Sequence, residues 1–176
     1  GVGKTALTEA MLHVGGAINQ LGSVDNGTAV TDFEEQERER KISISPALCH
    51  VEHRGSKINI VDCPGYSEFY VDALYGLWAT DNALLVLDAA AGVEVHTIKM
   101  YDAARELNVR VIGVVNKLDN ERADFAAAVA DMNESLSGCE AVPVQVPIGQ
   151  GTSFQGVVDL LTGKAHFASG EIGEVP

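Results

Sequence analysis

The sequence predicts an α/β fold in which a mostly parallel sheet carries helices on both faces. Short β-branched or apolar runs alternate with stretches of helical periodicity, and this order implies crossovers between parallel strands. The run 109–115 is almost continuously apolar, which is typical of a parallel strand buried on both faces.

The elements of the first half follow from periodicity and turn residues. Apolar residues recur at helical spacing after Lys4, and Gly15-Gly16 ends that helix. The polar segment 25–41 predicts a mobile loop with helical stretches. Strands are expected over 42–53 and 58–61, joined by a turn at 54–56.

The second half continues the alternation. Helices are expected over 68–77 and 97–107, and strands over 83–87 and 109–115. An amphipathic helix follows, because apolar residues recur at intervals of four, three and four. These residues are Phe125, Val129, Met132 and Leu136.

The composition is that of an ordinary soluble domain, with 176 residues of which 46% are hydrophobic. No apolar stretch is long enough to span a bilayer, so we expect no membrane partner. Three scattered cysteines without metal spacing indicate reduced thiols in a cytoplasmic protein. The net charge of −13 argues against direct binding of nucleic-acid phosphates by this segment.

The first five residues, Gly1-Val2-Gly3-Lys4-Thr5, match the end of a phosphate-binding loop. Backbone amides and a helix N-terminus cradle phosphates, Lys4 adds a positive charge, and Thr5 offers a hydroxyl to Mg²⁺. The full pattern has another glycine upstream, so we expect a longer protein with a strand before this loop. Alone, the motif could equally be a plain loop entering a helix.

A second motif, Asp62-Cys63-Pro64-Gly65, follows the strand 58–61. Asp62 is expected to be the acidic partner of the metal site, acting through water, and Gly65 lets the backbone approach the γ-phosphate. Taken alone, the motif could also be a simple turn.

A third motif, Asn116-Lys117-Leu118-Asp119, follows the apolar strand 109–115. The Asp119 carboxylate can accept from two adjacent N–H groups of guanine, and such bonds are worth about 1.5–3 kcal/mol each. The stem of Lys117 can cover a purine face, and Asn116 completes the base site. The motif is also a good helix start. However, it follows a buried strand, and ligands of open α/β sheets bind beyond the carboxyl ends of the strands. Together, the three motifs in this order predict that the bound nucleotide is GTP.

The charged stretch 31–41 could be a solvated surface. However, Ser43 follows it between Ile42 and Ile44. This pattern favours a loop whose hydroxyl folds onto Mg²⁺, orders around the γ-phosphate and is released on hydrolysis.

At this point the chain resembles elongation factor G and related translational GTPases. The three motifs, the stretch 32–44, and the segments 146–149 and 154–159 match that family in order. The resemblance implies a P-loop GTPase fold in a multidomain, ribosome-binding factor that cycles between GTP and GDP. It implies a GTP-binding domain over 1–141, without its first strand and last base-contacting loop, and the start of an inserted subdomain over 142–176.

The resemblance also assigns roles. Lys4, Ser43, Gly65 and Tyr66 form the expected catalytic set, and Thr5, Ser43 and Asp62 the expected metal site. Tyr66 stands where the family usually has a histidine that places the attacking water. A phenol with a pKa of about 10 can hold a water but cannot act as an imidazole does at neutral pH.

Other departures are Lys41 for the usual glycine, Ser43 for threonine, and Gly1 for a frequent aspartate. The tyrosine at position 66 makes the chain resemble divergent, slower paralogues called elongation factor G-like proteins. The sequence therefore predicts Mg²⁺-dependent GTP hydrolysis.

Two alternatives stay open: a hydrolysis-poor, GTP-gated ribosome-binding factor, and a tetracycline-protection or release-recycling relative. We expect residues 1–176 alone to fold poorly and to bind GTP weakly.

Overall fold

The computed structural model describes residues 1–175, and the chain divides into two compact units. The first unit comprises Gly1 with residues 3–83 and 103–110, and the second comprises the remainder, including Val2. Within the described residues, no helix combines the length and the apolar character that crossing a membrane requires.

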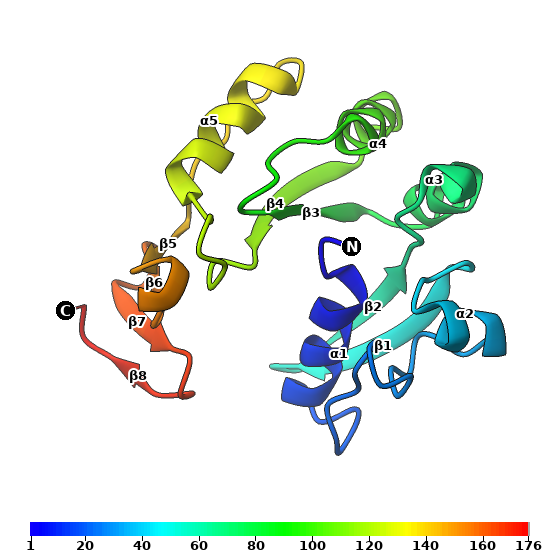
Figure 1. The fold of residues 1–176 in the computed structure, drawn as a ribbon, viewed down its shortest axis with the longest axis horizontal. Helices are drawn as coiled ribbons and strands as arrows, with labels where there is room; N and C mark the ends of the chain where they lie inside the picture. The colour runs from blue at the N-terminus through cyan, green and yellow to red at the C-terminus, as the bar shows by residue number, and fades with distance from the viewer. Residues whose placement is uncertain (176) are drawn as a thin grey trace. The chain divides into compact units, whose positions relative to one another are not determined.

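The first unit is built from helices and one β-hairpin (Figure 1). Its elements are α1 (Lys4–Val14), α2 (Glu35–Arg40), β1 (Ala47–His53), β2 (Ser56–Asp62), the 3₁₀ helix η1 (Ser67–Phe69) and α3 (Tyr70–Trp78). β1 and β2 are antiparallel, and the turn residues Arg54 and Gly55 both have positive φ, 49° and 77°. This is the pattern of a two-residue type I′ hairpin, whose twist matches that of the strands.

Helix α1 packs against this hairpin and ends where the glycines predict. A Cβ on Gly15 would collide with Val51, so the helix end lies directly against β1. Leu12 and Val51 are buried, 2% and 4% exposed. The predicted helix at the start of the chain is therefore confirmed.

The strand predicted over 42–53 begins only at Ala47. The amides of Ile44 and Ser45 donate to the Glu37 side chain and not to a neighbouring strand. Pro46 has no N–H to contribute to a ladder. The prediction of a strand over 42–46 is wrong because these amides are satisfied elsewhere.

Helix α3 approaches the end of β2 closely. A Cβ on Gly76 would collide with the Cys63 sulfur, so the helix backbone lies against that thiol. Burial raises the pKa of Cys63 to about 11. On the same helix, Tyr75 and Trp78 are 56% and 65% exposed and make an edge-to-face ring contact.

The second unit holds a strand–helix–strand segment, a further helix and a small sheet. Its elements are β3 (Asn82–Asp88), α4 (Val95–Glu106), β4 (Arg110–Asn116), α5 (Phe125–Ser135), β5 (Gln145–Ile148), the 3₁₀ helix η2 (Gly151–Ser153), β6 (Gly156–Asp159), β7 (Lys164–Phe167) and β8 (Ile172–Gly173). The first residues of β3 and β4 and the end of α4 fall in the first unit. β3 pairs with β4, and their arrows run the same way in Figure 1.

The core of this unit forms where α5 meets the β3–β4 pair. Leu87, Met132 and Leu136 are buried together, which confirms the predicted apolar seam of α5. Burial of β4 on both faces is a wrong prediction, because Ile112 is 55% exposed. Met132 of α5 contacts Gly113, the residue after Ile112. Successive residues of a strand point to opposite faces, so α5 covers the Gly113 face and not the Ile112 face.

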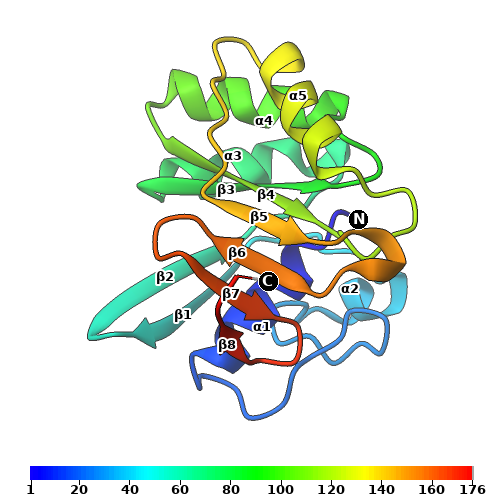
Figure 2. The ribbon, with the colours of Figure 1, turned by 90° about the vertical axis from the view of Figure 1, so that its left-hand side faces the viewer.

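The chain from Gln145 onward forms a four-stranded antiparallel sheet in the order β5-β6-β7-β8 (Figure 2). Val158 and Ala165 are its buried hydrophobic residues, at 9% and 0% exposure. This sheet starts with β5 at Gln145, and the subdomain boundary expected at residue 142 stays a prediction.

Candidate functional site

The motif predicted to bind phosphates lies at the start of α1. Gly3 is the N-cap, with φ 95°, a left-handed conformation in which glycine is unstrained. No side chain caps this helix end. The first-turn amides are therefore available to an anion, and the helix dipole favours negative charge at this place.

Lys4 lies over the second motif. A Cβ on Gly65 would collide with Lys4 Nζ, so only glycine leaves the ammonium this position. Burial lowers the pKa of the Lys4 ammonium, and the nearby Asp62 carboxyl opposes the shift. A charge in this partly desolvated place attracts phosphate more strongly than it would in water.

Two hydroxyls that the sequence assigned to a metal come together. Thr5 Oγ1 and Ser43 Oγ are 3.0 Å apart, although 38 residues separate them. The Ser43 hydroxyl also donates to Asp32 Oδ1 at 2.9 Å. Asp32 is buried, and sequence reasoning did not single it out.

Asp62 completes this group. It is 4% exposed, and among the described residues its Oδ2 atom has no hydrogen-bond partner. Burial raises the pKa of the Asp62 carboxyl, and the nearby hydroxyls of Thr5 and Thr31, together with the Lys4 ammonium, oppose the rise. A buried oxygen without a partner is what a cation would satisfy, and oxygen ligands are those that Mg²⁺ requires.

The residues therefore fit Mg²⁺ through two hydroxyls and a carboxylate. No cluster of three or more His, Cys, Asp or Glu suited to a metal occurs within residues 1–175. A metal ion bound beside Thr5, Ser43 and Asp62 would take its other oxygens from nucleotide and water.

Two buried glutamates hold the segment that carries Ser43. Glu9 accepts hydrogen bonds from the amides of Gly22, Val30 and Thr31, at 3.2, 2.7 and 3.4 Å. Glu37 accepts from three further amides. Both side chains are 0% exposed. Sequence reasoning missed both, although the three-residue spacing of Glu34 and Glu37 is that of a capping box.

The motif predicted to recognise the base lies in the second unit, at the end of β4. Asn116 Nδ2 donates to the main-chain oxygen of Val2 at 2.9 Å. Lys117 Nζ pairs with Asp88 Oδ2 at 2.9 Å, and this hydrogen bond holds the pKa of Asp88 below its usual range. The Asp119 side chain is exposed.

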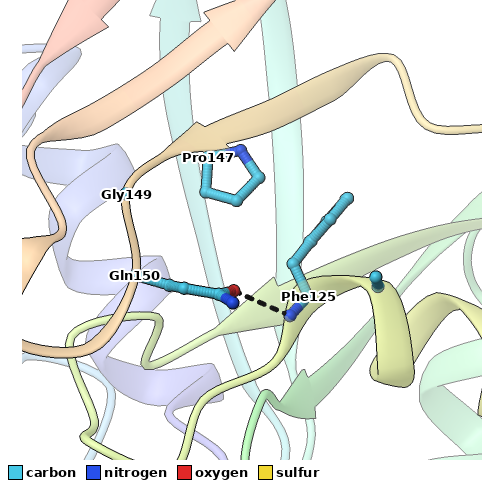
Figure 3. A pocket seen from close by; sticks show the side chains of 5 residues that line it. Phe125, Pro147, Gly149 and Gln150 are labelled. Atoms are coloured by element: carbon cyan, nitrogen blue, oxygen red, sulfur yellow. Dashed lines mark hydrogen bonds between the residues drawn. The ribbon is translucent and has the colours of Figure 1, made fainter.

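The loop after β5 braces this motif. The Gly151 amide donates to the main-chain oxygen of Leu118 at 2.7 Å. Gln150 Oε1 accepts from the Phe125 amide at the start of α5, at 3.1 Å, beside a shallow hollow that Pro147 also lines (Figure 3). The sequence marks this loop only by its Gly-Gln-Gly run.

Tyr66 directly follows Gly65 and precedes η1. Its side chain is 48% exposed, so the phenol hydroxyl is accessible to water. The role of Tyr66 stays a prediction.

Comparisons with known proteins identify the family to which the chain is similar. The family described as "Elongation factor Tu GTP binding domain" matches residues 1–168. The chain is 42% identical to elongation factor G of Fervidobacterium nodosum over 93% of its own length, and 40% identical to that of Thermotoga neapolitana over 98%. It is also 39% identical, over 92% of its length, to the mitochondrial ribosome-releasing factor 2 of Culex quinquefasciatus.

A solved structure from Thermus thermophilus is similar to the whole chain, with a TM-score of 0.91 and 33% identity. The similarity covers 27% of that protein, and the chain spans 21–25% of the curated relatives named above. The match therefore concerns about a quarter of each relative.

Proposed function

The chain belongs to the family of elongation factor Tu GTP-binding domains, and on that premise we propose that it is the GTP-binding and GTP-hydrolysing part of an elongation factor G-like translation factor acting on ribosomes. The similarity to two elongation factors G over more than nine-tenths of the chain supports this. The P-loop GTPase fold predicted from the sequence is that of the family.

The observation that carries the proposal is the buried Asp62 Oδ2, which has no hydrogen-bond partner within residues 1–175. Asp62 lies near Thr5, whose hydroxyl is 3.0 Å from that of Ser43. We assign these three residues to Mg²⁺, which when bound neutralises charge on the β- and γ-phosphates. Lys4 and the amides from Gly1 to Thr5 bind the phosphates. Gly65 has no Cβ and therefore leaves room for the Lys4 ammonium.

In the second unit, Asn116, Lys117 and Asp119 are assigned to the guanine base. The exposed Asp119 carboxylate accepts from the two adjacent N–H groups of guanine, which adenine does not offer. The loop at Gly151 supports this role because it fixes Leu118, the residue before Asp119.

Catalysis in such a site consists mainly of positioning and electrostatics. Lys4 stabilises charge on the phosphates, the Ser43 hydroxyl closes the switch segment over them, and Tyr66 holds the attacking water by a hydrogen bond. A phenol does not take a proton at neutral pH, so slow hydrolysis is expected.

The decisive experiment is single-turnover GTP cleavage by the intact protein with and without ribosomes. Ribosomes should stimulate cleavage, and Asp119→Asn should shift the preference from guanosine to xanthosine nucleotides. Absence of ribosomal stimulation rejects the translational assignment, and unchanged base preference rejects the base site.

A release-recycling function is the second candidate, favoured by the similarity to ribosome-releasing factor 2. Assays of translocation and of ribosome splitting with the intact protein distinguish the two. We further propose a cytoplasmic location and contact with the ribosome outside this acidic segment. We also propose a boundary near residue 142 between the GTP-binding domain, 1–141, and an inserted subdomain, 142–176.

A further inference from the structure

Glu37 is a fully buried carboxylate on α2, 0% exposed. Its three donors are all main-chain amides: Oε2 accepts from Glu34 at 3.0 Å, and Oε1 from Ile44 at 2.8 Å and Ser45 at 3.0 Å. A carboxylate removed from water is tolerated only where its lone pairs are satisfied. Because these donors belong to the backbone, Glu37 constrains the path of the chain.

That path leads directly through Ser43. The main-chain oxygen of Glu37 accepts from the Ile42 amide at 3.2 Å, while its side chain accepts from the Ile44 amide. Both sequence neighbours of Ser43 are thus bonded to one residue. The hydroxyl of Ser43 is left to Thr5, at 3.0 Å, and Asp32, at 2.9 Å.

Neighbouring contacts strengthen this arrangement. The Ser45 hydroxyl donates to Glu34 Oε1 at 2.9 Å, and Arg38 Nε donates to the main-chain oxygen of Asp32 at 2.8 Å. Helix α2 has only six residues, too few to be stable by itself. Tertiary contacts, with Glu37 at their centre, therefore hold the segment from Asp32 to Ser45.

We propose that Glu37 is a positioning residue for the triphosphate-bound state. It holds the Ser43 hydroxyl where it can bind the metal that joins the phosphates, and it thereby contributes to the preference for GTP over GDP. This rests on the proposed function, in which the Ser43 contact with the metal depends on the γ-phosphate. In this proposal Glu37 acts through Ser43 and is not itself assigned to the nucleotide or the metal.

The test compares affinities of the intact protein for GDP and for a non-hydrolysable GTP analogue, both with Mg²⁺. Glu37→Gln keeps the side-chain size but puts an NH₂ group where an amide donor needs an acceptor. We expect the affinity for the analogue to fall about tenfold and that for GDP to change less than about twofold. Glu39→Gln, an equal charge change at an exposed position of the same helix, should alter neither.

A double-mutant cycle with Ser43→Ala separates positioning from general destabilisation. In the Ser43→Ala background, Glu37→Gln should have little further effect, because Glu37 acts through that hydroxyl. If the glutamine variant is unfolded by circular dichroism, Glu37→Asp, which keeps the charge on a shorter stem, carries the same comparison. Equal loss of GDP and analogue binding in a folded variant, no loss at all, or effects that add to those of Ser43→Ala overturn the inference. A wild-type protein that does not bind GDP refutes the proposed function instead.

Discussion

Lys41 ends helix α2 in a left-handed conformation, with φ 56° and ψ 39°. An L-residue in this region costs about 1–2 kcal/mol, and glycine avoids the cost because it has no Cβ. Against this, glycine loses more freedom on folding, roughly 0.5–1 kcal/mol. Lys41→Gly should therefore stabilise the folded segment by about 0.5–1 kcal/mol, which makes its local opening roughly two- to fivefold rarer.

Hydrogen exchange of the Ile44 and Ser45 amides measures this opening directly, because both donate to Glu37 just beyond Lys41. Lys41→Ala, which removes the charge but keeps the Cβ, should leave the exchange rates nearly unchanged. Arg54→Gly relieves the same kind of strain in the β1–β2 turn, φ 49°, and should not affect these two amides. Faster exchange in Lys41→Gly, or equal slowing in Lys41→Ala, refutes the role of backbone strain.

Gly65→Ala should displace Lys4 Nζ, because the added Cβ would collide with it. We expect GTP binding to weaken at least about tenfold and the free energy of unfolding to change by less than about 1 kcal/mol. A large loss of stability in denaturant titrations contradicts this. Burial raises the pKa of the Asp62 carboxyl in the folded state above its value in the unfolded state, which is about 4. The contribution of Asp62 to stability is therefore complete below the unfolded-state pKa and is lost as the pH rises through the folded-state pKa. In the nucleotide-free protein, the Asp62→Asn variant should thus become more stable relative to wild type as the pH rises between these two pKa values. The same variant should lose at least about tenfold in Mg²⁺-dependent GTP affinity. A difference in stability that does not vary with pH contradicts a buried charge at Asp62. Gly151→Ala and Gly163→Ala both place alanine at positive φ, 61° and 68°, and should each cost about 1–2 kcal/mol of stability. Only the first should speed GDP dissociation several-fold, since only Gly151 donates to Leu118; equal dissociation rates would show that the brace does not support the base site.

Sequence reasoning works best here where a local pattern decides the structure. The glycines after α1 and the apolar seam of α5 predict those helices, and the order of the motifs predicts the fold class that the family match confirms. The pairing of the Thr5 and Ser43 hydroxyls agrees with their shared assignment to one metal site.

It fails where distant main-chain groups decide. Glu37 lies between the exposed Glu35 and Glu39, and only its three-residue spacing from Glu34, that of a capping box, distinguishes it locally. Its partners Ile44 and Ser45 are amides, which every non-proline residue carries, so the sequence gives no sign of them. The strand predicted over 42–46 fails for the same reason.

The close approach of Gly76 to the Cys63 sulfur puts the backbone of α3 directly against a side chain of the segment that begins at Asp62. We expect a shift of that segment, when a triphosphate replaces a diphosphate, to reach α3 through this contact. The chain's only tryptophan, Trp78, ends that helix and is largely exposed to solvent. The molecule thus carries an intrinsic fluorophore whose emission should follow the nucleotide cycle without any added label.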